Sequence, residues 1–100
     1  MMAKLSATET ETALRDLPGW RVDAVREAIV KNYVFADFVQ AFGFMSQAAL
    51  IAERMDHHPE WSNVYKTVNV LLTTHDADGL TQKDIELARH MERIAQRVGA

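Results

Sequence analysis

The spacing of apolar residues along this chain changes from helical to alternating, and the change separates the predicted helices from the predicted strands. Residues Asp37 to Met55 contain no proline and one glycine, and their apolar positions recur every three or four residues. Such a stripe is wide enough to cover a sheet and to contact a neighbouring surface. The segment therefore predicts a core helix of about five turns, which we expect Pro59 to end. Its two apolar rows are Phe38, Phe42, Met45, Ala49 and Ala52, and Phe44, Ala48, Ile51 and Met55; we interpret them as core packing rather than a cofactor pocket.

Capping patterns predict a helix on either side of this core helix. Ser6 to Glu9 reads as a capping box, which predicts a short helix from about Ser6 to Asp16 that Pro18-Gly19 ends. Thr81 to Asp84 opens a last helix in the same way. Its apolar face carries Ile85, Ala88, Met91, Ala95 and Val98, with Leu87 and Ile94 beside them.

Segments rich in β-branched and aromatic residues predict two hairpins between these helices. The strands are Trp20–Asp23 with Glu27–Phe35, and Ser62–Tyr65 with Val68–Thr74. Ala24-Val25 contains neither glycine nor asparagine, so it does not predict the turn of the first hairpin. Lys66-Thr67 joins the second hairpin, and Asp76–Gly79 forms a turn before the last helix.

The order α-β-β-α-β-β-α predicts a two-layer α+β fold. We expect a four-stranded, mostly antiparallel sheet with three helices on one face, because the connections return over the same side. The other face of the sheet is left open. One hundred residues predict a single domain over residues 1–100 whose core is small, so burial at a subunit interface would help to stabilise it.

Composition excludes several classes of function. A formal net charge of -3 without a basic run argues against direct nucleic-acid binding. Apolar residues at 48% and charged residues at 25% are ordinary for a folded domain rather than a disordered chain. No segment has the apolar length of a signal peptide or a membrane span, so we expect a cytoplasmic protein with no membrane partner. Without cysteine, any chemistry depends on histidine and carboxylate side chains.

Three histidines are placed to meet at one edge of such a fold. His57 and His58 follow the core helix and His75 follows the last predicted strand, so a helix end and a strand end can bring them together. Glu53 precedes His57 by four residues, the spacing at which it could orient that imidazole. Asp56 or Asp76 could do the same for another histidine.

Simpler interpretations compete at several of these positions. A histidine at a helix C-terminus can simply complement the helix dipole, and His90 in the last helix is expected at the surface. Asp84 is explained by capping, and Trp61 by packing in the core. Adjacent histidines do not have the spacing of a helical zinc site, and no serine stands in a nucleophile elbow. Acid-base chemistry remains, since three imidazoles suit an elimination or a hydration near neutral pH.

Three runs of sequence resemble the pterin-4a-carbinolamine dehydratases. They are Ala41–Met45, Glu53–Tyr65 with its double histidine before Pro-x-Trp, and Thr73–Thr81. The resemblance covers nearly the whole chain, from Gly19-Trp20 to the final helix. It implies removal of water from the 4a-hydroxytetrahydropterin that aromatic amino acid hydroxylases produce. The product would be a quinonoid dihydropterin in tetrahydrobiopterin-type recycling, with no metal or organic cofactor.

The resemblance also implies roles for particular residues. His57 and His75 would be acids for the two stereoisomers of the hydroxyl group, and His58 would hold and orient the pterin, so these three form the expected catalytic set. The ring would lie against the turn at Pro59 and the strand end, with Trp61 as a wall. The expected substrate-binding residues are Glu53, His57, His58, Pro59, Trp61, Thr74, His75, Asp76 and Ala77, and no metal ligands are expected.

The resemblance suggests protein partners as well. Members of this family are typically homotetramers, so we expect a homodimer or homotetramer built partly through the core helix. Lys83 stands where an arginine often occurs near the pocket, which keeps the charge without the bidentate fork. The alternative function is a helix-pairing interaction module, a dimerisation cofactor whose histidines have no catalytic part.

Overall fold

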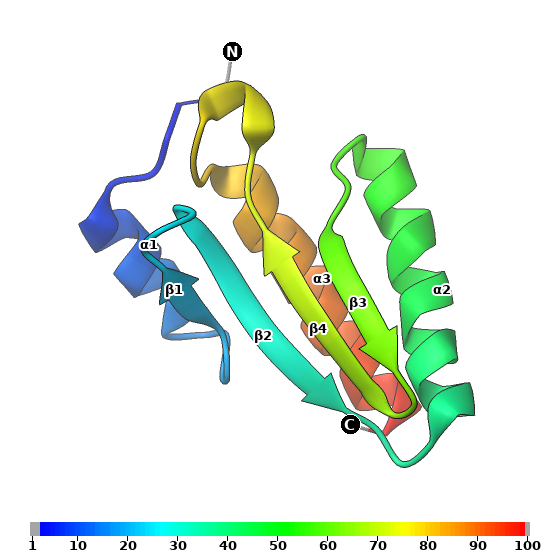
Figure 1. The fold of residues 1–100 in the computed structure, drawn as a ribbon. Helices are drawn as coiled ribbons and strands as arrows, with labels where there is room; N and C mark the ends of the chain where they lie inside the picture. The colour runs from blue at the N-terminus through cyan, green and yellow to red at the C-terminus, as the bar shows by residue number, and fades with distance from the viewer. Residues whose placement is uncertain (1–2, 100) are drawn as a thin grey trace.

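The computed structural model describes residues 3–99 and has the expected order of helices and strands, with one additional short 3-10 helix (Figure 1). The sheet contains β1 to β4 and the helical layer contains α1 to α3, while the 3-10 helix η1 follows the last strand. The elements are α1 (Ala7–Leu14), β1 (Arg21–Asp23), β2 (Ala28–Val34), α2 (Phe38–Met55), β3 (Glu60–Val64), β4 (Thr67–Leu72), η1 (His75–Ala77) and α3 (Gln82–Val98).

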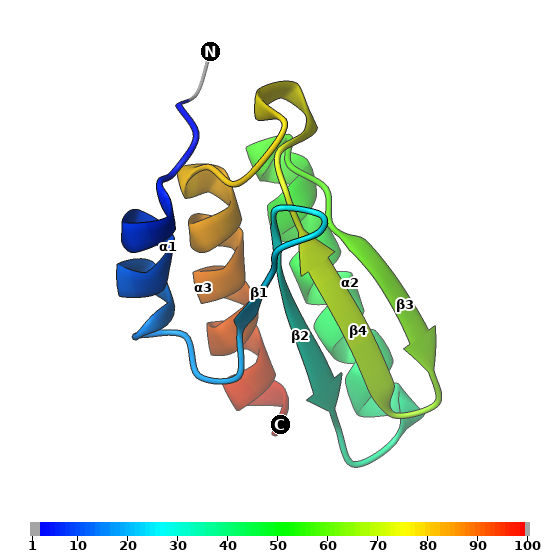
Figure 2. The same cartoon turned by 60° about the vertical axis from the view of Figure 1, so that its left-hand side comes forward.

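The four strands form one sheet in the order β1-β2-β4-β3, and all three neighbouring pairs are antiparallel. Figures 1 and 2 show the helices gathered behind this sheet, so the predicted two-layer α+β fold is confirmed. Strand alternation explains the two faces. Val68, Val70 and Leu72 are buried toward the helices, whereas Asn69 between them is exposed on the open face.

The core lies between the sheet and the paired helices α2 and α3. Phe44 of α2 is fully buried and packs against the rings of Tyr33 and Phe35, with centroids 4.7 and 5.1 Å away. Burying one such side chain contributes about 1.5–3 kcal/mol. The other row of α2 turns outward at its N-terminal end, where Phe38 and Phe42 remain 48% and 58% exposed, whereas Ala52 at its C-terminal end is buried. The broad stripe predicted from the sequence therefore has an inner and an outer part.

One helix ends earlier than predicted, and another ends where predicted but for a different reason. α1 has the expected capping box at Ser6 but ends at Leu14, followed by a turn rather than by helix up to Asp16. α2 ends at Met55, because Asp56 adopts a left-handed conformation with φ 51° and ψ 45°. The expectation that Pro59 ends α2 was wrong. The backbone N–H of the left-handed residue bonds to carbonyls of the last helical turn, and the chain turns away before it reaches the proline.

The second hairpin is shifted relative to the sequence prediction. β3 begins at Glu60, directly after Pro59, because Glu60 pairs with Leu71 of β4. The turn consists of Tyr65 and Lys66, because Val64 pairs with Thr67, and the φ of 51° at Tyr65 lets the chain reverse there. β4 ends at Leu72, so His75 lies in η1 rather than at the end of a strand.

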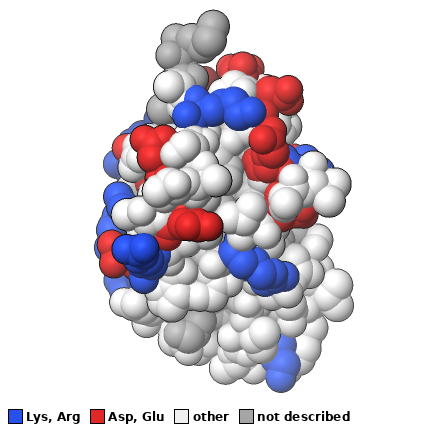
Figure 3. Space-filling model, turned by 90° about the vertical axis from the view of Figure 1, so that its left-hand side faces the viewer, with Lys and Arg blue, Asp and Glu red and all other residues white. Residues whose placement is uncertain are grey.

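Charge is mixed over the surface that carries α1. Figure 3 shows lysines and arginines interspersed with aspartates and glutamates on this face, without a field of one sign. Within residues 3–99, no helix combines the length and the hydropathy required to cross a membrane.

Candidate active site

Three elements and one connecting segment meet at one end of the molecule. The C-terminal end of α2, the segment after β4, η1 and the beginning of α3 lie together at the upper end of Figure 1, and Figure 2 shows the same grouping. A cavity of about 310 Å³ opens there. Its lining brings all three predicted histidines together: Asp56, His57, His58, Thr73, Thr74, His75, Asp76 and Lys83.

His57 is held from behind by a buried carboxylate. Its Nε2 lies 2.6 Å from Oδ1 of Asp84, which is fully buried, while the His57 side chain is 8% exposed. The second oxygen of Asp84 accepts from the Thr81 backbone N–H at 2.9 Å and from the Thr74 hydroxyl at 2.8 Å. Asp84 therefore connects the start of α3 to the residues that follow α2 and β4.

The turn at the end of α2 explains how His57 reaches Asp84. The backbone N–H groups of Asp56 and His57 both donate to carbonyls of the last helical turn, at Glu53 and Ala52. This arrangement ends the helix and directs the chain toward the N-terminal end of α3. The His57 imidazole consequently points inward to the α3 N-terminus rather than along the face of α2.

The other two histidines bond to carboxylates at the surface. Nε2 of His58 lies 2.8 Å from Glu53, and Nε2 of His75 lies 3.1 Å from Glu60. The His58 and His75 side chains are 59% and 74% exposed. Glu60 also accepts from Arg26 at 2.7 Å, and the hydrogen bonds from Arg26 and His75 lower the pKa of its carboxyl group.

These contacts correct the predicted partners. Glu53 bonds to His58 and not to His57, because α2 stops at Met55 and His57 no longer continues the helical face of Glu53. Glu60 is the carboxylate beside His75, whereas neither Asp56 nor Asp76 was found bonded to a histidine among residues 3–99. Each of the three histidines at the cavity thus has a separate carboxylate partner.

The predicted substrate-binding residues do not all reach the cavity. Thr74 and Asp76 line it with the histidines, but Glu53, Pro59 and Ala77 are not part of the lining.

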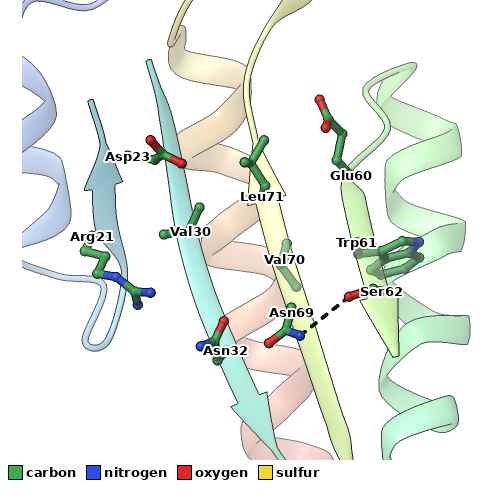
Figure 4. Close-up of a pocket in the computed structure, with 10 residues that line it drawn as sticks. All are labelled: Arg21, Asp23, Val30, Asn32, Glu60, Trp61, Ser62, Asn69, Val70 and Leu71. Atoms are coloured by element: carbon green, nitrogen blue, oxygen red, sulfur yellow. Dashed lines mark hydrogen bonds between the residues drawn. The ribbon is translucent and has the colours of Figure 1, made fainter. Parts of the chain in front are cut away.

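Trp61 lies elsewhere, half-buried against the core from β3. It belongs to a shallow depression of about 380 Å³ across the sheet, where Figure 4 draws its ring beside α2 and Ser62 bonded to Asn69. The residues around it come from all four strands. This depression is separate from the lining of the histidine cavity.

From the sequence, Asp84 was interpreted only as a capping residue. In the structure, its carboxylate also bonds to His57. The capping box at Thr81 is present, as predicted. Capping uses one oxygen of the carboxylate, and the other is bonded to His57 from 27 residues away. The only sequence signal was an acidic residue that follows the third histidine, His75, in the chain. Local spacing cannot reveal a hydrogen-bond partner that lies on another element.

The arrangement suits proton transfer. Three imidazoles border one cavity, and Lys83 adds a positive charge at its edge. Imidazole can donate or accept a proton near neutral pH, and a carboxylate partner fixes the orientation of each ring. No group of three or more histidines and carboxylates with the geometry to hold a metal ion occurs within residues 3–99.

Comparison with known families gives a match over most of the chain. The profile of a family described as pterin 4 alpha carbinolamine dehydratase matches residues 3–94. A protein of Rhodopseudomonas palustris strain BisB18 is 59% identical over 95 residues, which cover 95% of this chain and 94% of that protein. A protein of Burkholderia orbicola is 54% identical over 95% of this chain and 93% of its own length. Both carry the name "Putative pterin-4-alpha-carbinolamine dehydratase".

Solved structures share the fold. A crystal structure of a protein described as a transcriptional coactivator/pterin dehydratase from Brucella melitensis has a TM-score of 0.90 and 52% identity, covering 92% of this chain and 98% of that one. A pterin dehydratase-like protein described as a RuBisCO assembly factor in the alpha-carboxysome has a TM-score of 0.68. At 20% identity, covering 77% of this chain and 89% of that one, it supports the fold alone.

Proposed function

Because this chain belongs to the pterin-4a-carbinolamine dehydratase family, we propose that it removes water from a 4a-hydroxytetrahydropterin to give a quinonoid dihydropterin. The bond between C4a and the hydroxyl oxygen breaks, and that oxygen takes a proton to leave as water. The neighbouring ring nitrogen loses its proton, and those electrons form the new C=N bond. One acid and one base therefore suffice, and no metal or organic cofactor is required.

The observation that carries this proposal is the meeting of His57, His58 and His75 at one cavity, each beside its own carboxylate. A cavity of about 310 Å³ is at the small end of the range for small-molecule sites. The pterin would lie between the turn that carries His57 and His58 and the segment from Thr74 to Ala77. Glu53 supports His58 from outside, and Pro59 would limit the motion of the turn.

The test is the decay of enzymatically generated 4a-hydroxytetrahydropterin, followed by ultraviolet absorbance. Wild type should accelerate this decay, and His75→Ala should lose the acceleration by roughly 10²-fold or more, the usual contribution of one acid-base group. His90→Ala is the matched control, because His90 lies on α3, bonded to Arg93 and outside the cavity lining. A folded wild type that leaves the decay unchanged would contradict the proposed activity.

We also propose a homodimer or homotetramer as the working form, functionally linked to an aromatic amino acid hydroxylase that supplies the substrate. The outer surface of α2 carries four exposed apolar side chains, Phe38, Val39, Phe42 and Leu50, which are between 48% and 77% exposed. Apolar side chains gathered on one helix favour burial against another surface.

A helix-pairing module without catalysis is the second candidate. Two observations favour it: the exposed apolar row of α2, and the word coactivator in the description of the Brucella melitensis relative. The two candidates respond oppositely to mutation. His75→Ala should abolish dehydration and leave helix pairing intact, whereas a charge at Phe42 should disrupt pairing.

A further inference from the structure

We propose that Arg26 is a positioning residue for His75, which it holds in place through the carboxylate of Glu60 that both residues share. Arg26 lies in the turn between β1 and β2 and is not part of the cavity lining. This inference rests on the proposed dehydratase function and deepens it, because it adds a residue of the first hairpin to the support of the acid.

The strand register brings this turn to the end of the sheet at which the cavity opens. Leu71 of β4 lies opposite Val30 of β2 on one side and opposite Glu60 of β3 on the other. The beginnings of β2 and β3 therefore flank the end of β4, from which the chain continues to His75. Figures 1 and 2 show the β1–β2 turn at this end of the sheet, and Figure 4 draws the Glu60 carboxylate at the beginning of β3.

The turn that carries Arg26 is fixed by its own contacts, although its sequence is not typical of a hairpin turn. Oδ1 of Asp23 accepts from the backbone N–H groups of Val25 and Arg26, at 3.1 and 3.3 Å. Glu27 has a φ of 50° and completes the reversal into β2. Its backbone carbonyl accepts from the hydroxyl of Thr73, a residue that lines the cavity, at 3.1 Å. The turn is therefore anchored to the cavity wall beside Arg26.

One oxygen of Glu60 joins the guanidinium to the imidazole. Oε2 accepts from Nη2 of Arg26 at 2.7 Å and lies 3.1 Å from Nε2 of His75. The hydrogen bond from Arg26 is the main cause that lowers the pKa of Glu60, and the same bond raises the pKa of Arg26. Glu60 is therefore an ionised carboxylate near neutral pH. Because such a group can only accept, Nε2 of His75 donates to it.

Glu60 requires this support because its contact with His75 is exposed. The side chains of His75 and Glu60 are 74% and 41% exposed, and Glu60 is the hydrogen-bond partner of the His75 imidazole within residues 3–99. An isolated exposed pair holds its side chains weakly, because both can rotate into water, whereas a network of several charges holds them better. The short charged hydrogen bond from Arg26 restricts the carboxylate and keeps its oxygen beside the imidazole.

The kinetic test compares variants at Arg26 in the assay of 4a-hydroxytetrahydropterin decay. Arg26→Gln should lower kcat by roughly 5- to 50-fold, more than one exposed ion pair contributes and less than a whole acid-base group. KM should stay near the wild-type value, because Arg26 lies outside the cavity lining. Arg26→Lys keeps the charge and a donor for Glu60, so it should lose less activity than Arg26→Gln.

Arg21→Gln is the matched control. Arg21 is exposed on β1 of the same hairpin, so the variant loses the same charge without touching Glu60. It should keep the wild-type kcat. A loss equal to that of Arg26→Gln would overturn the proposal, because the effect would then follow from net charge rather than from the contact with Glu60.

A double variant tests whether Arg26 acts through Glu60. If it does, Arg26→Gln should have little further effect on kcat in a protein that already carries Glu60→Gln. Independent losses that multiply in the double variant would overturn the proposal. Thermal unfolding of each variant shows that the compared proteins are folded.

The position of His75 can also be measured without substrate. Relaxation of ¹³C-labelled imidazoles by NMR reports the motion of each ring. We expect the His75 ring to be more mobile in Arg26→Gln than in wild type. The His58 ring should not change, because its partner Glu53 lies on α2. Equal mobility of the His75 ring in both proteins would overturn the proposal.

Failure of this proposal and failure of the proposed function give different results. If wild type does not accelerate the decay, the proposed function fails, and the relaxation measurement still decides whether Arg26 positions His75. If wild type is active and Arg26→Gln has a mobile His75 ring with unchanged kcat, the contact has no part in catalysis and the proposal is overturned. Should Arg26→Gln not fold, Arg26→Met takes its place in the same measurements.

Discussion

At the scale of single residues, the buried cluster around Tyr33 shows how strongly the surroundings of a side chain change its pKa. Tyr33 is 3% exposed, and its hydroxyl donates to Glu92, which also pairs with Lys31 at 2.8 Å. Lys31 lies 4.6 Å from the centre of the Tyr33 ring. Burial and the hydrogen bond to Glu92 raise the pKa of Tyr33 far above its ordinary value of 10.0.

This raised pKa predicts an alkaline loss of stability. The unfolded chain releases the Tyr33 proton near pH 10 and the folded chain retains it, so the contribution is complete below that pH and declines above it. One such group lowers the free energy of unfolding by about 1.4 kcal/mol per pH unit there. The free energy of unfolding can be measured with urea between about pH 9 and 11, around the ordinary tyrosine pKa. It should decline less steeply with pH in Tyr33→Phe than in wild type. Equal slopes would contradict this assignment.

At the scale of one element, α2 contains a residue that weakens it. Gly43 lies in the helix interior, where glycine costs roughly 0.5–1 kcal/mol relative to alanine. Among side chains and other elements within residues 3–99, a Cβ there would meet Cγ1 of Val98 at 3.8 Å, an ordinary contact. The site therefore has room for a methyl group between α2 and α3.

Gly43→Ala should stabilise the protein by about 0.5–1 kcal/mol, measured by urea unfolding near neutral pH. Gly19→Ala is the control with the opposite sign. Gly19 has a φ of 85°, and a Cβ there would come within 2.9 Å of the Lys31 side chain, so that variant should lose stability. Destabilisation by Gly43→Ala would show that α2 and α3 pack more closely than the structure indicates.

At the scale of the whole molecule, the exposed apolar side chains on the outer surface of α2 predict association. Phe42→Glu places a charge on the proposed interface and should shift the protein to the mass of one chain in light scattering after gel filtration, because burying an unpaired carboxylate is costly. Gln47→Glu is the matched control, since it adds the same charge at an exposed polar position of α2. A monomeric wild type would contradict the proposed oligomer.

The periodicity of the chain was sufficient to predict most of the fold. Helical spacing in α2, capping boxes at Ser6 and Thr81, and alternating β-branched segments are local signals, and all three agree with the structure. Local signals also led to the errors. Pro59 is a strong helix breaker in the sequence, yet the left-handed conformation of Asp56 ended the helix first.

The sequence by itself determined which chemistry is available: a double histidine, a third histidine before the last helix, no cysteine, and a capping aspartate at residue 84. Only the tertiary structure decided which carboxylate meets which imidazole. Glu53 is four residues from His57 but bonds to His58, and Asp84 is 27 residues from His57 and bonds to it. The reason is physical. Periodicity reports the face on which a residue lies within its own element, whereas a buried hydrogen bond depends on where two elements end in space.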